Sequence, residues 1–379
     1  MKRRPWLLAA LLGWACALGL PLRAEEFLDS QTREQVVMIP AGGFTEPELE
    51  LTIFRPPGDG PFPVVVINHG RNSGNAKFQQ RYRPLLAAGE FVRRGYAVAV
   101  PMRQGFSKSG GYEISGGCNV GINGLEQARS VRRTLDWLGQ QPWADVSRNV
   151  VMGQSHGGFT TLAYGTDPHP GTRLLVNFAG GLRQEGCTAW QQNLIRAIGG
   201  YGETSRLPSL WFYGDNDSYF QSFIWREAHE RFVQAGGRAE LVAFGTFSGD
   251  SHSMFGSVAG LPIWLPRVTA AMDQVGLPTT VVHVLTPPKD LTPPPPSGVA
   301  KVEEVDKVPL RNDRAREGYQ AWLRADGPKA FAIHPVHGNW ASAWSGERPY
   351  ARALANCERV AHEPCKLYAV DDAVVWNPE

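Results

Sequence analysis

Between residues 48 and 250, short and unbroken apolar runs alternate with segments that have the periodicity of amphipathic helices. Strands are expected at residues 49–54, 64–68 and 96–101, and in the runs that begin at Asn149, Leu174, Leu210 and Glu240. Helices are expected over residues 84–94 and 124–138, the second with Leu125, Ala128, Val131, Leu135 and Leu138 on one face. Apolar strands separated by helices predict a mostly parallel sheet that is covered on both faces.

The pentapeptide Gly153-Gln154-Ser155-His156-Gly157 directly follows one of these strands and precedes a helical stretch at residues 159–164. This is the G-x-S-x-G pattern in a strand–turn–helix context. Side chains at Gly153 or Gly157 would collide with neighbouring backbone in so tight a turn. Ser155 is therefore predicted to be a nucleophile at the end of its strand. The alternative interpretation is a plain glycine-rich turn.

A serine hydroxyl needs a base to take its proton, and the base needs a carboxylate to orient it. Of the nine histidines, His252 lies in a polar loop after the last predicted strand. Asp217 lies in the loop that follows the run at 210–214, and the order Ser155, Asp217, His252 is typical of such sheets. Asp215 is the alternative carboxylate, and Asp250 is expected to cap a loop.

The tetrahedral intermediate of acyl transfer carries an oxyanion, which backbone N–H groups stabilise. One donor is expected from His156, the residue after the nucleophile. The other is expected in the turn after residues 64–68, where Gly70 permits the turn and Arg71 supplies the N–H. His69 belongs to the same turn and is not expected to act as the base.

These segments together resemble the dienelactone-hydrolase-like branch of the α/β-hydrolase superfamily over roughly residues 48–260. The residues that carry the likeness are NHGR from Asn68, RRGYAVAVPMRQGFSKSGG from Arg93, LDWL from Leu135, GQSHGG from Gly153, YGDND from Tyr213 and DSH from Asp250. The resemblance implies the α/β-hydrolase fold and hydrolysis of a small-molecule ester or related acyl bond without a cofactor. Dienelactone hydrolases have a cysteine where Ser155 stands, so their lactone substrate is not implied.

The motifs also resemble the catalytic domains of the prolyl-oligopeptidase group, whose elbow often ends in two glycines like Gly157-Gly158. The segment between Ala24 and residue 64 is too short for the propeller that usually gates those peptidases. An esterase is therefore favoured over a serine peptidase. A third alternative is a non-catalytic envelope binding protein on a hydrolase fold, against which the complete Ser/Asp/His set argues.

Residues 1–24 have the features of a secretory signal peptide. Lys2, Arg3 and Arg4 precede an apolar stretch at 6–20, and Ala24 offers a small residue at a cleavage point. The stretch is shorter than the ~20 residues that a spanning helix needs. An exported protein, periplasmic or secreted, with no stable membrane span after removal of the signal is expected.

Four cysteines follow the leader, and an even number in an exported chain favours disulfides over buried thiols. Their spacing favours a Cys357–Cys365 bond, which leaves Cys118 to pair with Cys187. No cysteine or histidine cluster has zinc-like spacing, so no metal is expected. The segment 187–207 has the spacing of an amphipathic helix, either a cap over the active site or a helix packed on the sheet flank.

Three parts are expected after the leader: a hydrolase domain at 25–285, a proline-rich linker at 286–312 and a small α+β module at 313–379. The linker begins with PPKDLTPPPP from Pro287, a composition typical of extended spacers. The module resembles small cysteine-containing modules of exported bacterial proteins and is a candidate for binding an envelope component. The net charge of +2 gives no indication of a nucleic-acid partner.

Overall fold

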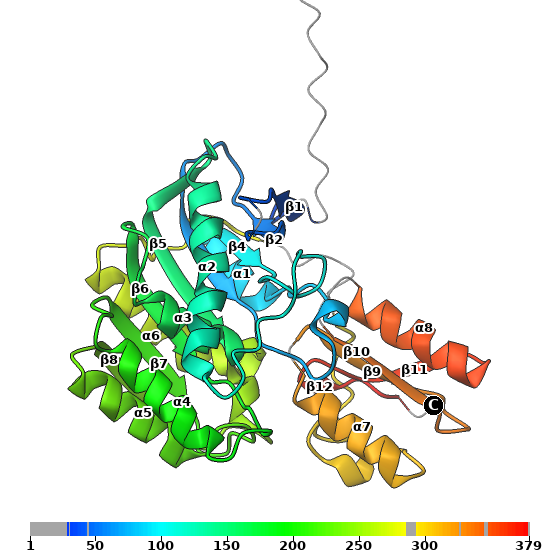
Figure 1. Ribbon diagram of the computed structural model, residues 1–379. Helices are drawn as coiled ribbons and strands as arrows, with labels where there is room; N and C mark the ends of the chain where they lie inside the picture. Colours follow the sequence, from blue (N-terminus) through cyan, green and yellow to red (C-terminus); the bar gives the residue numbers. More distant parts are fainter. Residues whose placement is uncertain are drawn as a thin grey trace, which may run out of the picture.

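The computed structural model describes residue 29 and residues 31–43, 45–285, 293–325, 327–344 and 348–377. The predicted leader at 1–24 lies outside these ranges, and so does the first part of the predicted linker, residues 286–292. Two sheets make up the fold (Figure 1): one with eight strands, and one with four strands that is formed near the carboxyl terminus.

The large sheet has the strand order β1-β2-β4-β3-β5-β6-β7-β8. Its strands are β1 (Gln35–Ile39), β2 (Leu49–Phe54), β3 (Phe62–Asn68), β4 (Ala97–Pro101), β5 (Ala144–Gln154), β6 (Thr172–Phe178), β7 (Pro208–Tyr213) and β8 (Arg238–Ala243). β2 pairs antiparallel with β1 and β4, and the pairs from β4 through β8 are parallel. This order confirms the predicted α/β-hydrolase fold with its mostly parallel sheet.

Helices cover both faces of the large sheet (Figure 1). α2 (Val120–Leu138), α3 (His156–Tyr164), α4 (Trp190–Tyr201) and α5 (Ser222–Gln234) cover one face, and α1 (Leu85–Val92) and α6 (Leu261–Gln274) cover the other. Along β3, Val64 and Val66 point into the first core, whereas Val65 and Ile67 point into the second. The unbroken apolar run of this strand follows from burial on both faces.

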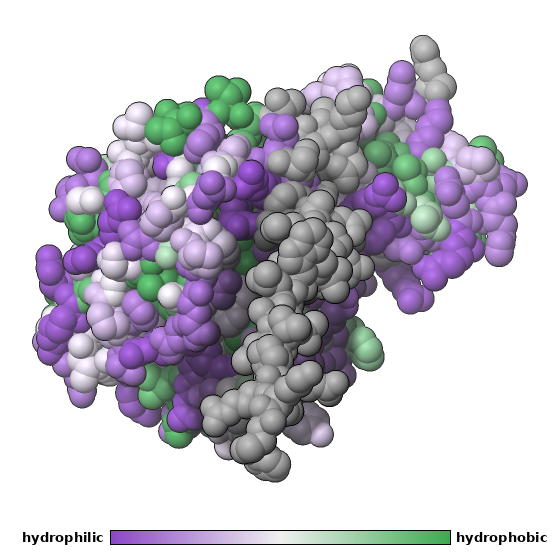
Figure 2. All heavy atoms as spheres, turned by 90° about the horizontal axis from the view of Figure 1, so that it is seen from above, coloured by the Kyte–Doolittle hydropathy of each residue, from purple (hydrophilic) through white to green (hydrophobic). Residues whose placement is uncertain are grey.

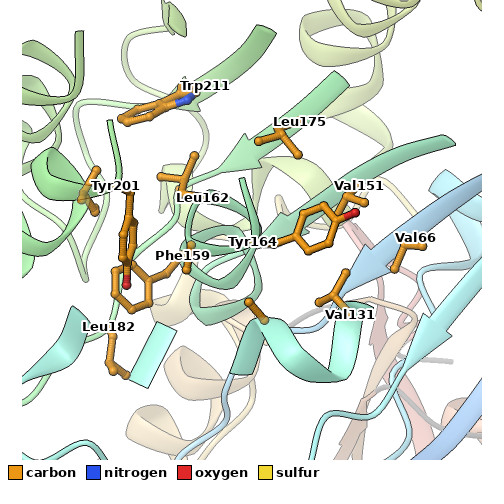
Figure 3. Close-up of a cluster of buried hydrophobic side chains, with 14 of the residues drawn as sticks. Val66, Val131, Val151, Phe159, Leu162, Tyr164, Leu175, Leu182, Tyr201 and Trp211 are labelled. Atoms are coloured by element: carbon orange, nitrogen blue, oxygen red, sulfur yellow. The ribbon is translucent and has the colours of Figure 1, made fainter. Parts of the chain in front are cut away.

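The core on the α3 side includes residues of α3, the helix that directly follows Ser155 (Figure 3). Phe159 and Leu162 of α3 are fully buried there, against Val151 of β5 and Leu175 of β6. Truncating a buried side chain of this size typically costs about 2–5 kcal/mol of stability. This packing fixes α3, and with it the turn that precedes α3.

The segment 187–207 forms α4, which packs on the flank of the sheet. Leu194, Ile195 and Ile198 of this helix are buried in the core that α4 shares with α2, α3 and α5. Of the two interpretations, the helix on the sheet flank is therefore correct, and the cap over the active site is wrong.

The small sheet has the order β10-β9-β11-β12 and is antiparallel throughout. Its elements are β9 (Lys329–Ile333), β10 (Trp340–Trp344), β11 (Lys366–Val370) and β12 (Ala373–Val374), with α7 (Asp313–Leu323) on one face and α8 (Pro349–Ala361) on the other. On β9, Phe331 and Ile333 face α7, whereas Ala330 and Ala332 face α8. We call these elements the C-terminal unit.

The second half of the predicted linker is part of the C-terminal unit. Val308 and Leu310 are buried in the same cluster as Tyr319 of α7. The Ser297 N–H donates to the carbonyl of Val374 at 2.9 Å. Residues 297–310 are therefore not a free spacer, because their interleaved apolar side chains pack against the small sheet.

On the face shown in Figure 2, outside the grey atoms, apolar side chains form small groups that hydrophilic side chains separate. In the part of the chain that the structure describes, no helix combines the length and apolarity needed to cross a membrane.

The C-terminal unit contacts two segments of the unit that is built on the large sheet. Asp372 accepts a hydrogen bond from the N–H of Val258 at 3.1 Å, and Arg352 donates to the side-chain oxygen of Gln80 at 3.3 Å. Beside these contacts lies a cavity of about 510 Å³, lined by α1, by Phe255 and by residues of the C-terminal unit that include Asp372.

The free energy of unfolding is expected to fall with rising pH because of two carboxyls of the C-terminal unit, those of Asp371 and Asp372. Burial raises the pKa of both Asp371 and Asp372. The folded state then favours their protonated forms, so stability is lost as the pH rises from about 4 through the raised pKa values. In the Asp371→Asn/Asp372→Asn variant, amide oxygens can still accept from Lys329 and Val258, and this loss should disappear. Thermal unfolding across pH compares the two proteins, and equal slopes would contradict the expectation.

Candidate active site

Ser155 lies in the turn between β5 and α3, in a backbone conformation that few residues other than glycine adopt. Its φ is 57° and its ψ is −124°, a strained combination that persists only where surrounding structure imposes it. A Cβ at Gly153 would collide with the carbonyl of Gly157, and a Cβ at Gly157 would collide with the carbonyl of Asn68. Ser155 is half-buried at the carboxyl end of its strand.

His252 and Asp217 form a buried pair. His252 Nδ1 lies 2.9 Å from Asp217 Oδ2, and the two side chains are 7% and 0% exposed. The other carboxylate oxygen, Oδ1, accepts from the N–H groups of Tyr219 at 2.8 Å and Phe220 at 2.9 Å. Because the carboxylate is an acceptor, the proton of a neutral His252 lies on Nδ1, which leaves Nε2 as a base.

Hydrogen bonds between loops bring this pair to the serine turn. Gln154, which directly precedes Ser155, donates to the carbonyl of His252 at 3.0 Å. Asp250 accepts from the N–H of His252 at 2.9 Å and from the N–H of Ser218 at 3.1 Å, so it braces two loops. Among the described residues the Ser155 hydroxyl makes no hydrogen bond, and such bonds often tighten only when substrate is bound.

The alternative carboxylate, Asp215, lies at the surface. Its side chain is half-exposed and lies 3.3 Å from a guanidinium nitrogen of Arg226. The structure thus brings Asp217, and not Asp215, to the histidine.

The two N–H groups predicted as oxyanion donors are both available. His156 is the first residue of α3, so its N–H has no partner within the helix. The carbonyl of Gly70 accepts from His69 Nδ1 at 2.6 Å and from the side chain of Gln79 at 3.1 Å. A trans peptide then points the Arg71 N–H the opposite way. In the described parts of the chain neither donor N–H has an acceptor.

The turn that carries Arg71 lies next to the nucleophile. A Cβ placed on Gly70 would lie 3.4 Å from the Cβ of Ser155. The side chain of Arg71 turns away from the donor N–H and forms an ion pair with Glu113.

Sequence reasoning missed a buried polar group behind these two donors. Arg103, two residues after β4, is fully buried and contacts both His69 and His156. The signal that was available is a charged residue directly after the apolar run AVAVPM.

One group of possible metal ligands comes together in the described part of the C-terminal unit. His334, His337 and Glu363 present donor atoms within 4.8 Å of one another. However, His334 Nδ1 accepts from the N–H of His337 at 2.9 Å, so its proton lies on Nε2, which donates to Glu363 at 2.8 Å. A protonated nitrogen cannot bind a metal, and hydrogen bonding accounts for the group.

Both predicted disulfides are confirmed. Cys118–Cys187 joins the loop after β4 to the loop before α4, and Cys357–Cys365 joins α8 to the residue before β11. Gln184 reinforces the first bond by donating to the carbonyl of Gly117 at 3.1 Å. Two disulfides are typical of a protein from an oxidising compartment.

Removing the Cys118–Cys187 bond is expected to lower the free energy of unfolding by about 2–4 kcal/mol. The bond closes a separation of 69 residues, whereas Cys357–Cys365 closes 8. Because longer closed loops restrict the unfolded chain more, Cys118→Ser/Cys187→Ser should lose more stability than Cys357→Ser/Cys365→Ser. Urea unfolding of both double variants measures this. A larger loss in the second variant would show that chain entropy does not control these bonds.

Residues 47–221 match the family model for X-Pro dipeptidyl-peptidase (S15 family). The match covers less than half of the chain. It includes Ser155 and Asp217 but ends before His252. No curated protein matches the sequence significantly.

Similar solved structures include both esterases and peptidases. A Klebsiella pneumoniae protein provisionally assigned as a dienelactone hydrolase is 16% identical with a TM-score of 0.48, over 64% of this chain and 98% of its own. An esterase from Pyrococcus furiosus is 16% identical with a TM-score of 0.46, over 64% and 90%. The acylaminoacyl peptidase of Pyrococcus horikoshii is 15% identical with a TM-score of 0.49, over 68% and 43%. Such weak likeness does not bear on activity or substrate.

Proposed function

We propose that this chain, which has the α/β-hydrolase fold, is a serine hydrolase of that superfamily that cleaves carboxylic esters through an acyl-enzyme intermediate. The observation that carries the proposal is the buried His252–Asp217 pair, tied through Gln154 to the strained turn at Ser155. A strained turn, a buried acid–base pair and two unengaged N–H groups at one sheet edge meet the requirements of acyl transfer.

In this proposal Ser155 Oγ attacks the ester carbonyl while His252 Nε2 takes the hydroxyl proton. The carbonyl oxygen becomes an oxyanion that accepts from the N–H groups of His156 and Arg71. Collapse breaks the ester bond, and His252 returns the proton to the leaving alcohol. Water, deprotonated by the same nitrogen, then releases the carboxylic acid and restores Ser155. Asp217 stays ionised and holds the imidazole in the required tautomer.

Peptide hydrolysis is the second candidate, and the match of residues 47–221 to the S15 dipeptidyl-peptidase model favours it. A dipeptidyl peptidase needs carboxylates for the substrate amino terminus. Glu113, which lies beside the predicted oxyanion turn, is neutralised by its ion pair with Arg71. This ion pair favours ester hydrolysis over the release of dipeptides.

The two disulfides and the predicted leader support a further part of the proposal, that the enzyme works outside the cytoplasm, in the periplasm or secreted. No cofactor enters the reaction, since the triad and two backbone N–H groups supply every proton transfer and the charge stabilisation.

The proposal is tested by initial rates on p-nitrophenyl esters of increasing acyl length, alongside Xaa-Pro p-nitroanilides. We expect Ser155-dependent turnover of the esters, with the length dependence reporting the size of the acyl site. Turnover of anilides alone would replace the ester reading with the peptidase one. If neither the esters nor the anilides were turned over and a fluorophosphonate probe failed to label Ser155, the hydrolase proposal itself would be wrong.

A further inference from the structure

The guanidinium of Arg103 is fully buried behind the candidate active site, and no carboxylate of the described residues forms a hydrogen bond with it. Within the described ranges it forms no ion pair, and its partners are uncharged. Nε donates to Gln127 at 3.1 Å, Nη1 to the carbonyl of His69 at 2.6 Å, and Nη2 to His156 Nδ1 at 3.3 Å. Glu113 interacts with this charge only through space, without a hydrogen bond. A buried charge that is not directly paired is costly in stability, which indicates a role for Arg103 beyond packing.

Two of these partners belong to the two turns that carry the oxyanion donors. His69 precedes the Gly70–Arg71 peptide, and His156 is itself the residue after the nucleophile. The backbone N–H of Arg103 adds a bond to His69 Nε2 at 3.0 Å. That bond places the ring proton of His69 on Nδ1, which donates to the carbonyl of Gly70 at 2.6 Å. Arg103 therefore fixes the Gly70 carbonyl, and the opposite N–H of Arg71, through His69.

The second turn is held in a similar way. His156 Nδ1 accepts from Arg103, so the ring proton lies on Nε2, which donates to Asn123 Oδ1 at 2.8 Å. Burial, together with the charge of Arg103, holds the pKa of His156 well below its ordinary range. The same two causes lower the pKa of His69. Both rings stay neutral, and each tautomer is set by its partners.

The charge of Arg103 persists at neutral pH. Burial lowers the pKa of its guanidinium to about 9, which is still well above neutrality. The ring of Phe106 covers the guanidinium at 5.4 Å and contacts the His69 ring edge-on at 4.7 Å. A fixed positive charge in such a dry site acts over a distance that water would screen.

We propose that Arg103 is a positioning residue that holds both oxyanion donors, the N–H groups of His156 and Arg71, and places a positive charge behind the oxyanion. This inference rests on the proposed function. The negative charge appears only in the transition state and the tetrahedral intermediate, so Arg103 should act on kcat and hardly on ground-state binding.

The first test is the kinetics of Arg103→Met on the best p-nitrophenyl ester. We expect kcat to fall about 10²–10³-fold, as when an oxyanion donor is lost, with KM within about threefold. Arg103→Lys keeps the positive charge but makes fewer hydrogen bonds, so its kcat should lie between those of the wild type and of Arg103→Met. The matched control is Arg133→Met, because Arg133 also donates to two carbonyls, those of Pro47 and Pro40, which belong to neither of the two oxyanion turns. The control should lose stability without a selective loss of kcat.

The second test needs no substrate. In histidine-selective ¹⁵N NMR spectra we expect His69 in the Nδ1–H form and His156 in the Nε2–H form. Arg103→Met should release the preference of His156, whose Nδ1 loses its donor, and speed the exchange of the His156 and Arg71 amides. His69 should keep the Nδ1–H form, because the backbone N–H of residue 103 still donates to its Nε2. If the wild type lacked Ser155-dependent turnover, the proposed hydrolysis would fail, and these spectra would still decide the placement of Arg103.

Three results would overturn the inference: unchanged kcat in Arg103→Met, a loss confined to KM, or an equal loss of kcat in the Arg133 control. Should Arg103→Met not fold, Arg103→Lys decides the matter by the same kinetics. A kcat equal to the wild-type value in that variant would show that the bidentate contact to the two turns has no catalytic role.

Discussion

Ser155→Ala is expected to lower kcat for ester hydrolysis about 10⁶-fold, with KM nearly unchanged. The substitution removes one oxygen atom and keeps the Cβ, so the turn between β5 and α3 and the buried His252–Asp217 pair remain. What is lost is the acyl-enzyme route, because no other atom at this position can form the covalent bond. The residual rate should come from the N–H groups of His156 and Arg71, which still stabilise an oxyanion formed by water attack.

The measurement is single-turnover and steady-state hydrolysis of a p-nitrophenyl ester, with thermal unfolding as a check on the fold. Ser253→Ala is the matched control, since Ser253 is adjacent to His252. Among the described residues, its hydroxyl bonds only to the carbonyl of Asp250, at 2.9 Å. The control should stay within a few-fold of the wild type. A Ser155→Ala protein that kept a tenth of the activity would locate the nucleophile elsewhere.

Elements of the fold could be predicted wherever the pattern of burial is local. β2 was predicted with the bounds that the structure shows, and β4 was predicted to within one residue, because apolar residues predominate in both strands. β1 was missed, since it is an edge strand whose side chains are alternately exposed and half-buried. α6 was missed for another reason: Pro262 and Pro266 lie within its first two turns.

In α6, tertiary packing prevails over the prolines. Trp264, Val268 and Met272 are buried at a spacing of four residues against the second core of the large sheet. A proline in the first turn has no N–H bond to lose, and the later one costs a single backbone hydrogen bond. The burial of three large side chains outweighs that cost, which the local sequence does not reveal.

The site residues likewise differ in whether the neighbouring sequence or only the folded chain reveals their role. Ser155 is readable because its glycines and flanking elements are neighbours in the sequence. Asp217 and His252 could be placed because each lies in a loop after a predicted strand, in the chain order Ser155, Asp217, His252. Arg103 could not be assigned, because its role depends on two turns, at His69 and His156, that only the folded chain brings together.

Asp217→Asn is expected to lower kcat about 10⁴-fold, although it changes one atom and keeps the shape of the side chain. The reason lies in the two backbone N–H groups, of Tyr219 and Phe220, that donate to Asp217 Oδ1. In the variant they require an acceptor, so the amide oxygen must occupy that position and the NH₂ group must face His252 Nδ1. A donor at this place forces the imidazole proton onto Nε2, the nitrogen that should take the proton of Ser155.

Such a loss corresponds to about 5.5 kcal/mol of transition-state stabilisation, and it should appear in kcat rather than in KM or in stability. Asp215→Asn is the matched control. Asp215 lies two residues away in the same loop, is half-exposed and, among the charged side chains that the structure describes, pairs only with Arg226. Its substitution should therefore change kcat less than threefold. Histidine-selective ¹⁵N NMR reports the mechanism directly, as His252 should change from the Nδ1–H to the Nε2–H form in Asp217→Asn alone. If kcat fell while the tautomer stayed the same, Asp217 would act through its charge rather than by orienting the ring, and equal losses in both variants would remove it from the triad.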